Sequence, residues 1–292
     1  MPTATFSSLD PKGQTSVSTW FITGCSSGLG RATAQVVLGH GHNAVVTARN
    51  AATLRAIGDG YPDTAQIVEL DVTDEAQVTA AVAAATSRFG GVDVLVNNAG
   101  YGYRAAVEEG ENADVDRLFA TNFFGPVSLI KAVLPGMRSR RTGAIVNVSS
   151  LGTRITPAGS GYYVAAKAAL EGMSASLRKE VEPLGITVIV AQPGQFRTDF
   201  AGRSLTQSPS AIADYAETAG KRRIEKDDVH GTQKGDPARA AQAIITAVEA
   251  PDPPFLLLLG TDAVEQFRIT HGAQSVEVDK WQELSVSTDF DA

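Results

Sequence analysis

Residues 19–30, with the sequence TWFITGCSSGLG, decide the fold. They contain a short apolar run, a turn with three glycines, and the start of a segment of helical composition that continues to Gly39. A strand, a glycine-rich turn and a helix in this order are the context in which phosphate-binding turns occur. Gly24 permits the tight turn, Gly28 lets the backbone approach a pyrophosphate, and Gly30 allows close packing of the helix on the strand. The segment therefore predicts a dinucleotide site at the helix N-terminus, with an ordinary structural turn as the alternative.

The same alternation continues along the chain, because short apolar runs alternate with longer alanine-rich segments. The runs predict strands at residues 19–23, 44–47, 66–70, 92–96, 144–148, 187–191 and 255–259. The segments between them predict helices at residues 29–39, 50–57, 75–89, 112–137, 161–183 and 237–249. Runs that are apolar throughout are typical of strands buried on both faces. The pattern predicts a doubly wound α/β fold, in which helices cover both faces of a seven-stranded parallel sheet.

The amino-acid composition and net charge restrict the classes of protein to which this chain can belong. The chain has 292 residues, of which 43% are hydrophobic and 20% charged, so it can bury a sizeable core. Its formal net charge of -7 gives no electrostatic reason to expect a nucleic-acid partner. The single cysteine, Cys25, favours a reducing compartment. The sequence shows neither a signal peptide nor a run of about 20 apolar residues, so we expect a cytoplasmic protein without a membrane partner.

Two stretches depart from the alternation within what we expect to be one domain for dinucleotide binding and catalysis, residues 19–292. Residues 201–235 are polar, predict a short helix near residues 211–225, and follow the sixth strand, so we expect them to cover a site at the carboxyl edge of the sheet. Residues 261–292 predict a helix at 262–271 followed by an acidic, weakly patterned end. Residues 1–18 are expected to form a flexible leader.

The end of the second predicted strand favours one form of dinucleotide. Sites specific for NAD carry an Asp or Glu about 20 residues after the last glycine. No acidic residue occurs from Arg31 to Gly58, and Arg49 stands where the acid is expected. A guanidinium pairs with a 2′-phosphate, which a carboxylate would repel. Arg49 therefore favours NADP(H), with a solvated surface arginine as the alternative.

Tyr163 and Lys167 are four residues apart in a predicted helix, so their side chains lie on one face. A nearby ammonium lowers the pKa of a phenol from its usual value of about 10. Such a tyrosine can give a proton to a developing alkoxide or take one from an alcohol. Ser150 ends the fifth strand, at the edge where open parallel sheets bind ligands. A tyrosine–lysine pair alone is also common as a purely structural or solvated feature.

Taken together, the motifs resemble those of the short-chain dehydrogenase/reductase family over roughly residues 19–260. They are the Thr-Gly-x-x-x-Gly-x-Gly turn at 23–30, Asp71-Val72, Asn97-Asn98-Ala99-Gly100, Asn122, Ser150, Tyr163-x-x-x-Lys167, and Pro193-Gly194 with Thr198. The resemblance implies a Rossmann-type fold. It also implies a homodimer or homotetramer that pairs through the helices predicted at 112–137 and 161–183.

The resemblance further implies four catalytic residues. Tyr163 would be the general acid in reduction and the general base in oxidation, and Ser150 would orient the substrate carbonyl. Lys167 would bind the nicotinamide ribose and tune Tyr163, while Asn122 would hold a water that links Lys167 to solvent. Asp71 and Val72 would contact adenine, Asn98 and Gly100 would support the cofactor wall, and Thr198 would bond the carboxamide. The full set of implied cofactor-binding residues is Gly24, Ser26, Ser27, Gly28, Leu29, Gly30, Arg49, Asp71, Val72, Asn98, Ala99, Gly100, Tyr163, Lys167, Pro193, Gly194, Phe196 and Thr198.

The resulting hypothesis is an NADP(H)-dependent reduction of a ketone or aldehyde to an alcohol, reversible as a secondary-alcohol dehydrogenase. The nicotinamide C4 would supply the hydride and Tyr163 the proton. One alternative is an NADP(H)-binding redox sensor or scaffold without turnover, which would not need Ser150, Tyr163 and Lys167 together. Another is a sugar-nucleotide epimerase, whose relatives have a different glycine spacing and longer chains.

The remaining candidates have weaker patterns. No histidine has a metal-ligand spacing, so we expect no metal. The basic run Lys221-Arg222-Arg223 reads as part of a solvated surface of mixed charge. The side chains that could line a substrate pocket, or could equally serve in packing, are Tyr101, Tyr103, Arg104, Gln195 and Phe196.

Overall fold

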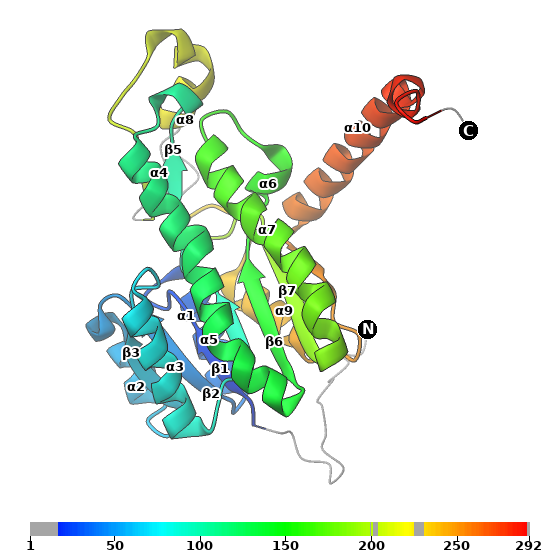
Figure 1. The fold of residues 1–292 in the computed structure, drawn as a ribbon. Coiled ribbons are helices and arrows are strands. Elements are labelled where there is room, and N and C mark those ends of the chain that lie inside the picture. Colours follow the sequence, from blue (N-terminus) through cyan, green and yellow to red (C-terminus); the bar gives the residue numbers. More distant parts are fainter. Residues whose placement is uncertain (1–16, 199, 201–203, 225–230, 291–292) are drawn as a thin grey trace.

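The computed structural model describes residues 17–198, 200, 204–224 and 231–290 (Figure 1). Residues 1–16 of the predicted leader lie outside the described residues, as do parts of the predicted cover. Seven parallel strands form one sheet in the order β3-β2-β1-β4-β6-β7-β9. They are β1 (Thr19–Ile22), β2 (Asn43–Ala48), β3 (Ala65–Glu69), β4 (Val94–Asn97), β6 (Gly143–Val148), β7 (Ile186–Pro193) and β9 (Leu256–Leu259). The predicted doubly wound α/β fold and its seven strands are confirmed.

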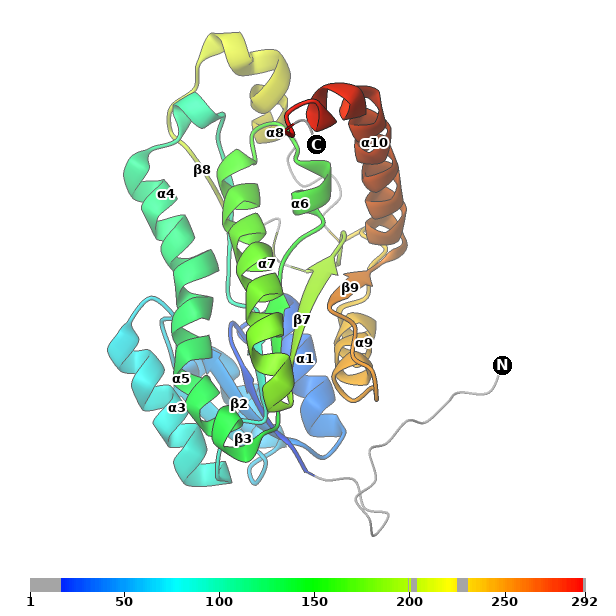
Figure 2. The same cartoon turned by 45° about the vertical axis from the view of Figure 1, so that its right-hand side comes forward.

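Helices cover both faces of the sheet (Figures 1 and 2). One layer contains α1 (Gly28–Gly39) and α9 (Pro237–Val248), and the other contains α3 (Glu75–Phe89), α5 (Gly125–Arg140) and α7 (Gly161–Val181). Successive strand residues point to opposite faces, so each strand feeds two cores. In β1, for example, Trp20 and Ile22 join the core under α1 and α9, whereas Phe21 joins the core under α3, α5 and α7.

Between β2 and β3 lie the short helices η1 (Ala51–Leu54) and α2 (Arg55–Gly60). The helix predicted at 112–137 is interrupted. It consists of α4 (Asn112–Phe119), the π-helical turn η3 (Ala120–Phe124) and α5, which continues to Arg140. π-helical turns insert one residue into a helix and occur often at functional sites. Here the turn contains the buried Asn122.

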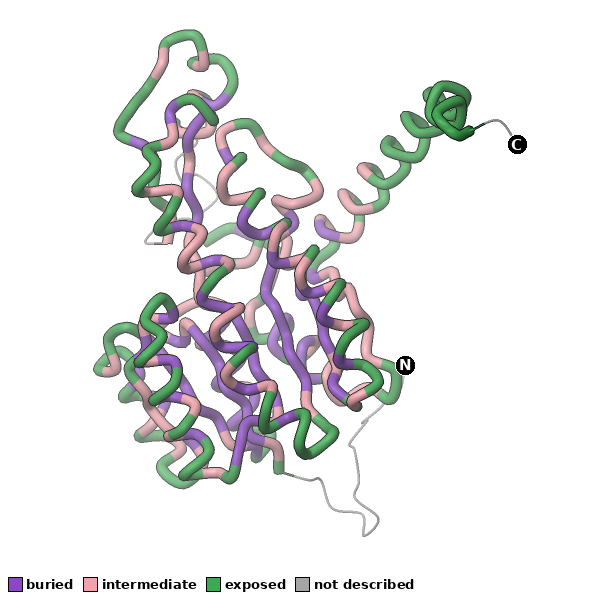
Figure 3. Tube along the Cα trace, in the orientation of Figure 1, coloured by how far each residue is buried: buried purple, intermediate pink, exposed green. Residues whose placement is uncertain are grey.

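The C-terminal helix differs from its prediction. α10 (Thr261–Val286) continues well past residue 271, where the predicted helix ends. Only Ala263 of α10 is buried, and the helix projects away from the sheet (Figures 1 and 3). Because the described residues of this helix from 271 onward are all exposed, its sequence carries no apolar stripe from which its length could be predicted.

A small second sheet is absent from the sequence prediction. β5 (Gly102–Arg104) pairs in parallel with β8 (Leu205–Gln207). Strands of three residues are too short to show a pattern. Their pairing joins the segment after β4 to the predicted cover. The cover continues through η6 (Ala213–Tyr215), η7 (Ala216–Gly220) and α8 (Lys221–Ile224).

One helical stretch of the described residues, Asn112–Arg140, is long and apolar enough to span a membrane by length and composition. The expectation that the sequence holds no stretch of membrane-spanning length and composition is therefore wrong. Leu129, Ile130 and Val133 in the stretch are buried in the core beside the sheet, which accounts for its apolar composition. Core helices of soluble proteins meet the same criterion.

Candidate active site

The glycine turn after β1 has the backbone shape that its sequence predicts. Gly24 and Gly28 have positive φ angles of 71° and 57°, a region that favours glycine. A Cβ on Gly30 would lie 2.5 Å from the carbonyl oxygen of Gly24 and against Nδ2 of Asn98. The tight turn predicted at Gly24 agrees with its backbone angle, whereas the close approach at Gly30 is to the turn itself and to Asn98.

The N-terminus of α1 suits an anion. Among the described residues, no side chain caps this end of the helix and its first turn contains no acid, whereas Asp74 caps α3 and Asp236 caps α9. Free N–H groups and the positive end of the helix dipole attract phosphate groups. This observation fits a dinucleotide pyrophosphate.

A hollow of about 330 Å³ adjoins the turn. Its lining residues are Ser26, Ser27, Gly28, Arg31, Arg197, Thr198 and Pro237. The sequence analysis did not assign a role to Arg31 or Arg197. Arg31 could have been found from the sequence, because it is a basic residue directly after the last glycine of the turn. Arg197 could not, because it reaches the hollow only through the fold of the loop after β7. Two guanidinium groups in this hollow increase its fit to an anionic ligand.

Asn98 and Ala99 hold the glycine turn in place. The Asn98 side chain donates to the carbonyl oxygens of Thr23 and Gly24 at 2.8 and 3.3 Å. The backbone N–H groups of Asn98 and Ala99 each donate to Thr23 Oγ1 at 2.9 Å. The predicted wall residues therefore couple the end of β4 to the turn after β1.

The predicted adenine side of the site lies at the ends of β2 and β3. Arg49 is exposed directly after β2. Asp71 accepts bonds from the backbone N–H and the hydroxyl of Thr73, and Val72 is buried. Contact of Asp71 and Val72 with adenine, and of Arg49 with a 2′-phosphate, stays a prediction.

The residues after β7 divide between the site and its surroundings. Pro193 ends β7, and the backbone N–H of Gly194 donates to Leu259 at 2.9 Å, so both anchor the strand end. Thr198 lies over the glycine turn, because a Cβ on Gly28 would be 3.3 Å from its Cβ. Phe196 packs against the core under α1 and α9. This packing favours the structural alternative for Phe196 over a place in the pocket.

The predicted catalytic side chains come together at the carboxyl edge of the sheet. Ser150 follows β6, while Tyr163 and Lys167 lie on α7. The Ser150 hydroxyl accepts a bond from Gly152 N at 3.0 Å and is hydrogen-bonded to Tyr163. Lys167 is 4% exposed, and its Nζ donates to the carbonyl oxygen of Val148 at 2.8 Å. Serine, phenol and ammonium groups are thus held by neighbouring elements.

Asn122 and Gly100 lie beside Lys167. A Cβ on Gly100 would be 2.9 Å from Asn122 Oδ1 and 3.4 Å from Lys167 Nζ, so glycine leaves room for both polar groups. The Asn122 amide accepts from Tyr101 N at 3.1 Å and donates to Tyr101 O at 2.8 Å. These bonds fix the wall around Gly100. The predicted water relay through Asn122 stays a prediction.

The electrostatics of the pair differ from the expected lowering of the tyrosine pKa. Desolvation raises the pKa of Tyr163 to about 12, and the hydrogen bond from Ser150 opposes this effect. Desolvation also lowers the pKa of Lys167 to about 8, and the negative charge of Glu171 opposes it. Tyr163 therefore keeps its proton at neutral pH, which suits a proton donor.

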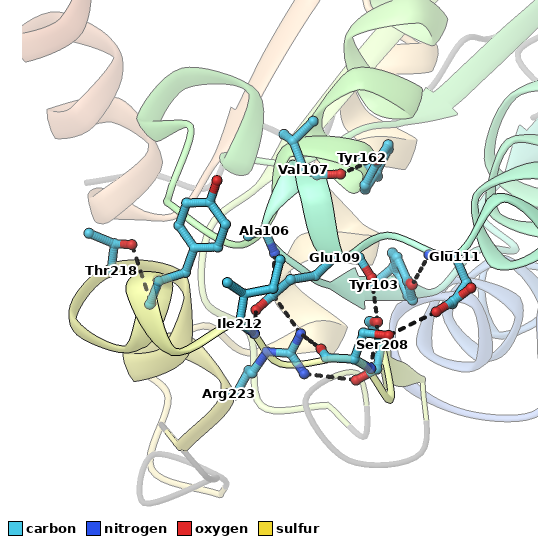
Figure 4. A network of polar contacts seen from close by, with 12 residues as sticks. Tyr103, Ala106, Val107, Glu109, Glu111, Tyr162, Ser208, Ile212, Thr218 and Arg223 are labelled. Carbon is cyan, nitrogen blue, oxygen red and sulfur yellow. Dashed lines mark hydrogen bonds and ion pairs between the residues drawn. The ribbon is translucent and has the colours of Figure 1, made fainter.

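The described part of the cover is attached to the loop after β5 by a buried ion pair (Figure 4). The Glu109 side chain is 2% exposed and accepts bonds from Arg223, Ile212 N and Ala106 N at 2.6, 2.8 and 2.9 Å. Arg223 also donates to Ser208 O at 2.7 Å. Burial raises the pKa of Glu109, but the bonds from Ile212, Arg223 and Ala106 outweigh it and hold the pKa below its ordinary value.

The ion pair corrects the interpretation of the basic run. Lys221 does lie on the surface, paired with the exposed Glu217 at 2.9 Å. The Arg223 side chain, however, is only 14% exposed because Glu109 binds it. The partner lies more than 100 residues away in the chain, so the local mixture of charges around the run did not reveal it.

Two aromatic residues near Tyr163 differ in how far they are buried. Tyr103 is 2% exposed and packs with Leu118 and Ala105, so it belongs to a small core and does not line the pocket. Phe200 is 41% exposed, and its ring lies 5.9 Å from that of Tyr163. The sequence analysis did not single out Phe200, which brings an apolar surface to the site.

Burial raises the pKa of the Cys25 thiol to about 12, so this cysteine behaves as a small buried apolar group. Within the described ranges, no three histidine, cysteine, aspartate or glutamate side chains are placed to hold a metal ion.

Comparison with known proteins agrees with this geometry. Residues 18–208 match the family model described as short chain dehydrogenase. An oxidoreductase of Botryotinia fuckeliana, BOA17, is 38% identical over 92% of this chain and 98% of its own length. The 3-ketodihydrosphingosine reductase of Bacteroides thetaiotaomicron is 38% identical over 82% of this chain and 86% of its own length.

The solved structures agree as well. A short-chain dehydrogenase from Streptomyces avermitilis has a TM-score of 0.87 and 39% identity, with 94% of this chain and 100% of that chain covered. Structures with this fold include complexes with NAD and with NADP, so a nicotinamide dinucleotide is the typical cofactor. Because the family model covers more than half of the chain and a relative of similar length is 38% identical, the chain belongs to the short-chain dehydrogenase/reductase family and is an oxidoreductase of that family.

Proposed function

We propose that this protein uses NADPH to reduce a ketone or aldehyde to an alcohol, and that the reaction is reversible. The observation that carries the proposal is the convergence of Ser150, Tyr163 and Lys167 at the carboxyl edge of the sheet, beside the glycine turn. A redox sensor or scaffold would need the cofactor site but not this set of proton-handling groups.

The residues present fit a nicotinamide dinucleotide phosphate. The uncapped N-terminus of α1 and the hollow with Arg31 and Arg197 suit the pyrophosphate. Arg49 provides an exposed guanidinium where a carboxylate would mark preference for NAD. When bound, the nicotinamide supplies or accepts the hydride.

The chain's own residues then position the substrate and move the proton. The Ser150 hydroxyl, which accepts a bond from Gly152 N, donates its own proton to the substrate oxygen, because a carbonyl oxygen can only accept. Tyr163 transfers its phenolic proton to that oxygen as negative charge develops on it. The ammonium of Lys167 stabilises the resulting phenolate. In oxidation the same groups act in reverse, with Tyr163 accepting the alcohol proton.

The test is turnover with a panel of ketones and aldehydes. We expect NADPH consumption, followed by its absorbance, together with formation of the matching alcohol. Phe200 beside Tyr163 supports an apolar carbonyl compound as the preferred class of substrate. NADPH binding without turnover on any member of the panel would instead favour the sensor or scaffold.

The cofactor preference has its own prediction. Arg49→Asp should weaken NADPH binding about 10- to 100-fold, since hydrogen bonds to a charged group contribute about 1.5–3 kcal/mol. NADH binding should be unchanged or improved. Fluorescence titration with both cofactors measures the change, and Arg55→Asp, at another exposed arginine nearby, is the matched control. Equal affinity of the parent protein for NADPH and NADH would contradict the assigned role of Arg49.

The localisation, oligomeric state and partners of the enzyme are part of the same proposal. We propose a cytoplasmic homodimer or homotetramer with small-molecule substrates and no nucleic-acid or membrane partner. The acidic net charge and the presence of a single, buried cysteine support this assignment.

A further inference from the structure

Glu171 lies one helical turn beyond Lys167, as Lys167 lies one turn beyond Tyr163. The three side chains therefore share one face of α7. The Glu171 side chain is 15% exposed, which is unusual for a carboxylate that touches no bound ion. No motif used above includes this residue.

The Glu171 carboxylate is surrounded by donors. Its Oε1 lies 2.5 Å from Ser149 Oγ, 2.6 Å from Gln192 Nε2 and 2.8 Å from Thr153 Oγ1. Its Oε2 accepts a bond from Arg154 at 2.9 Å. Ser149 and Gln192 are almost fully buried. A buried carboxylate with several donors keeps its charge and holds their elements together.

These donors belong to the elements that hold Ser150. Ser149 precedes it at the end of β6, Thr153 and Arg154 lie in the one-turn helix α6 (Gly152–Ile155), and Gln192 belongs to β7. Thr153 Oγ1 also lies 2.9 Å from the carbonyl oxygen of Ser150. The carboxylate thus ties the turn that bears Ser150 to the helix that bears Tyr163 and Lys167.

Glu171 also opposes the loss of charge at Lys167. The other titratable groups near this pair are Tyr163 on α7 and Arg154 on α6. Packed against α7, β6 presents the Val148 carbonyl, β7 the Gln192 amide and η3 the Asn122 amide, all of them uncharged. Around the N-terminal part of α7, β5 and α4 present Tyr103 and Asp114.

We propose that Glu171 is a positioning residue for the reaction, which holds the Ser150 turn against α7 one helical turn beyond Lys167. This inference rests on the proposed carbonyl reduction. It assigns to one carboxylate both the alignment of the substrate-orienting serine and the charge state of the lysine.

The test variant is Glu171→Gln, which keeps the size of the side chain and removes its charge. The Lys167 ammonium should then titrate about one pH unit lower, which is within the effect of one neighbouring charge. The alkaline limb of the pH profile of kcat/KM should move down by the same amount. Glu180→Gln, at an exposed position on the same helix, should move neither quantity.

A second variant has the opposite expected sign. Arg154→Met removes the cation that pairs with Glu171 but leaves the carboxylate, so Lys167 should titrate at higher pH. NMR of protein labelled at the lysine Cε carbons follows this titration without any turnover, and Lys167→Arg identifies the signal. This variant also keeps the test decisive if Glu171→Gln does not fold.

The outcomes separate the two proposals. Turnover by the parent protein, with the Lys167 titration and the pH profile both unmoved in Glu171→Gln, overturns the positioning role and leaves the proposed function intact. In another outcome, the parent protein reduces no carbonyl compound while the Lys167 titration still shifts in Glu171→Gln. That result overturns the proposed function but supports the coupling between Glu171 and Lys167.

Discussion

Tyr163→Phe should lower kcat for carbonyl reduction about 10²- to 10⁴-fold, the usual contribution of a positioned proton donor. The substitution removes only the hydroxyl, so the ring contact with Phe200 at 5.9 Å is retained. NADPH affinity should change little, because Lys167 and the glycine turn are untouched. Steady-state kinetics with the best carbonyl substrate, together with cofactor titration, measure the two effects separately.

The neighbouring tyrosine provides the matched control. Tyr162 donates its hydroxyl to the Val107 carbonyl at 2.5 Å, away from Ser150 and Lys167. Tyr162→Phe should therefore leave kcat within a few-fold of the parent value. Undiminished turnover in Tyr163→Phe would reject the assigned proton donor, and a large loss in both variants would point to packing as the cause.

Arg223→Met should release the described part of the cover, because it leaves the Glu109 carboxylate buried without its cation. Breaking a buried pair in this way costs about 3–5 kcal/mol. Arg223 keeps some solvent contact, so we expect the lower end of this range. Hydrogen exchange at the Ile212 amide, which donates to Glu109, should accelerate on the order of 100-fold through local opening.

The ion pair between Glu217 and Lys221 in the same segment supplies the control. Both of its side chains are largely exposed, so Glu217→Gln should change local stability by less than about 1 kcal/mol. Comparable exchange rates in Arg223→Met and Glu217→Gln would show that the cover is held by other contacts. The double variant Glu109→Met with Arg223→Met should recover part of the loss, since an apolar pair needs no buried charge.

The attachment of the cover also depends on pH. The pKa of Glu109 is lower in the folded protein than its ordinary value. The carboxylate therefore stabilises the folded state at pH values above the unfolded pKa, and this contribution is lost as the pH falls through the folded pKa. The protection of the Ile212 amide, taken relative to its intrinsic exchange rate at each pH, should fall under acidic conditions in the parent protein and depend less on pH in the double variant.

Most of the sheet, and the placement of the candidate site residues at its edge, could be predicted because their patterns are local. Apolar runs of four to eight residues predict buried strands, and all seven strands lie within two residues of their predicted bounds. The four-residue spacing of Tyr163 and Lys167 needs only helical geometry to place both groups on one face. The glycines of the turn can be interpreted from residue type alone, because glycine is the residue that most readily adopts a positive φ angle.

Side chains that depend on distant partners could not be assigned in this way. The sequence left pocket lining and packing equally open for Tyr103, and the packing of Leu118 against it decides for the core. The sequence indicated a surface charge for Arg223, whereas Glu109 binds it. Arg197 reaches the hollow beside the glycine turn only because the loop after β7 returns to the turn after β1. Each of these roles depends on a tertiary contact, and such a contact produces no periodic pattern in the sequence.

By itself, the sequence determined the doubly wound sheet, the glycine turn and the serine, tyrosine and lysine of the candidate active site. The tertiary structure decided which charges are buried, how the cover is attached and which carboxylate faces Lys167. The physical reason is the distance along the chain between interacting residues. The periodicity of a strand or helix is visible within a few residues, whereas the Glu109–Arg223 pair joins residues 114 positions apart. Burial and electrostatic coupling become defined only when the folded chain brings such groups together.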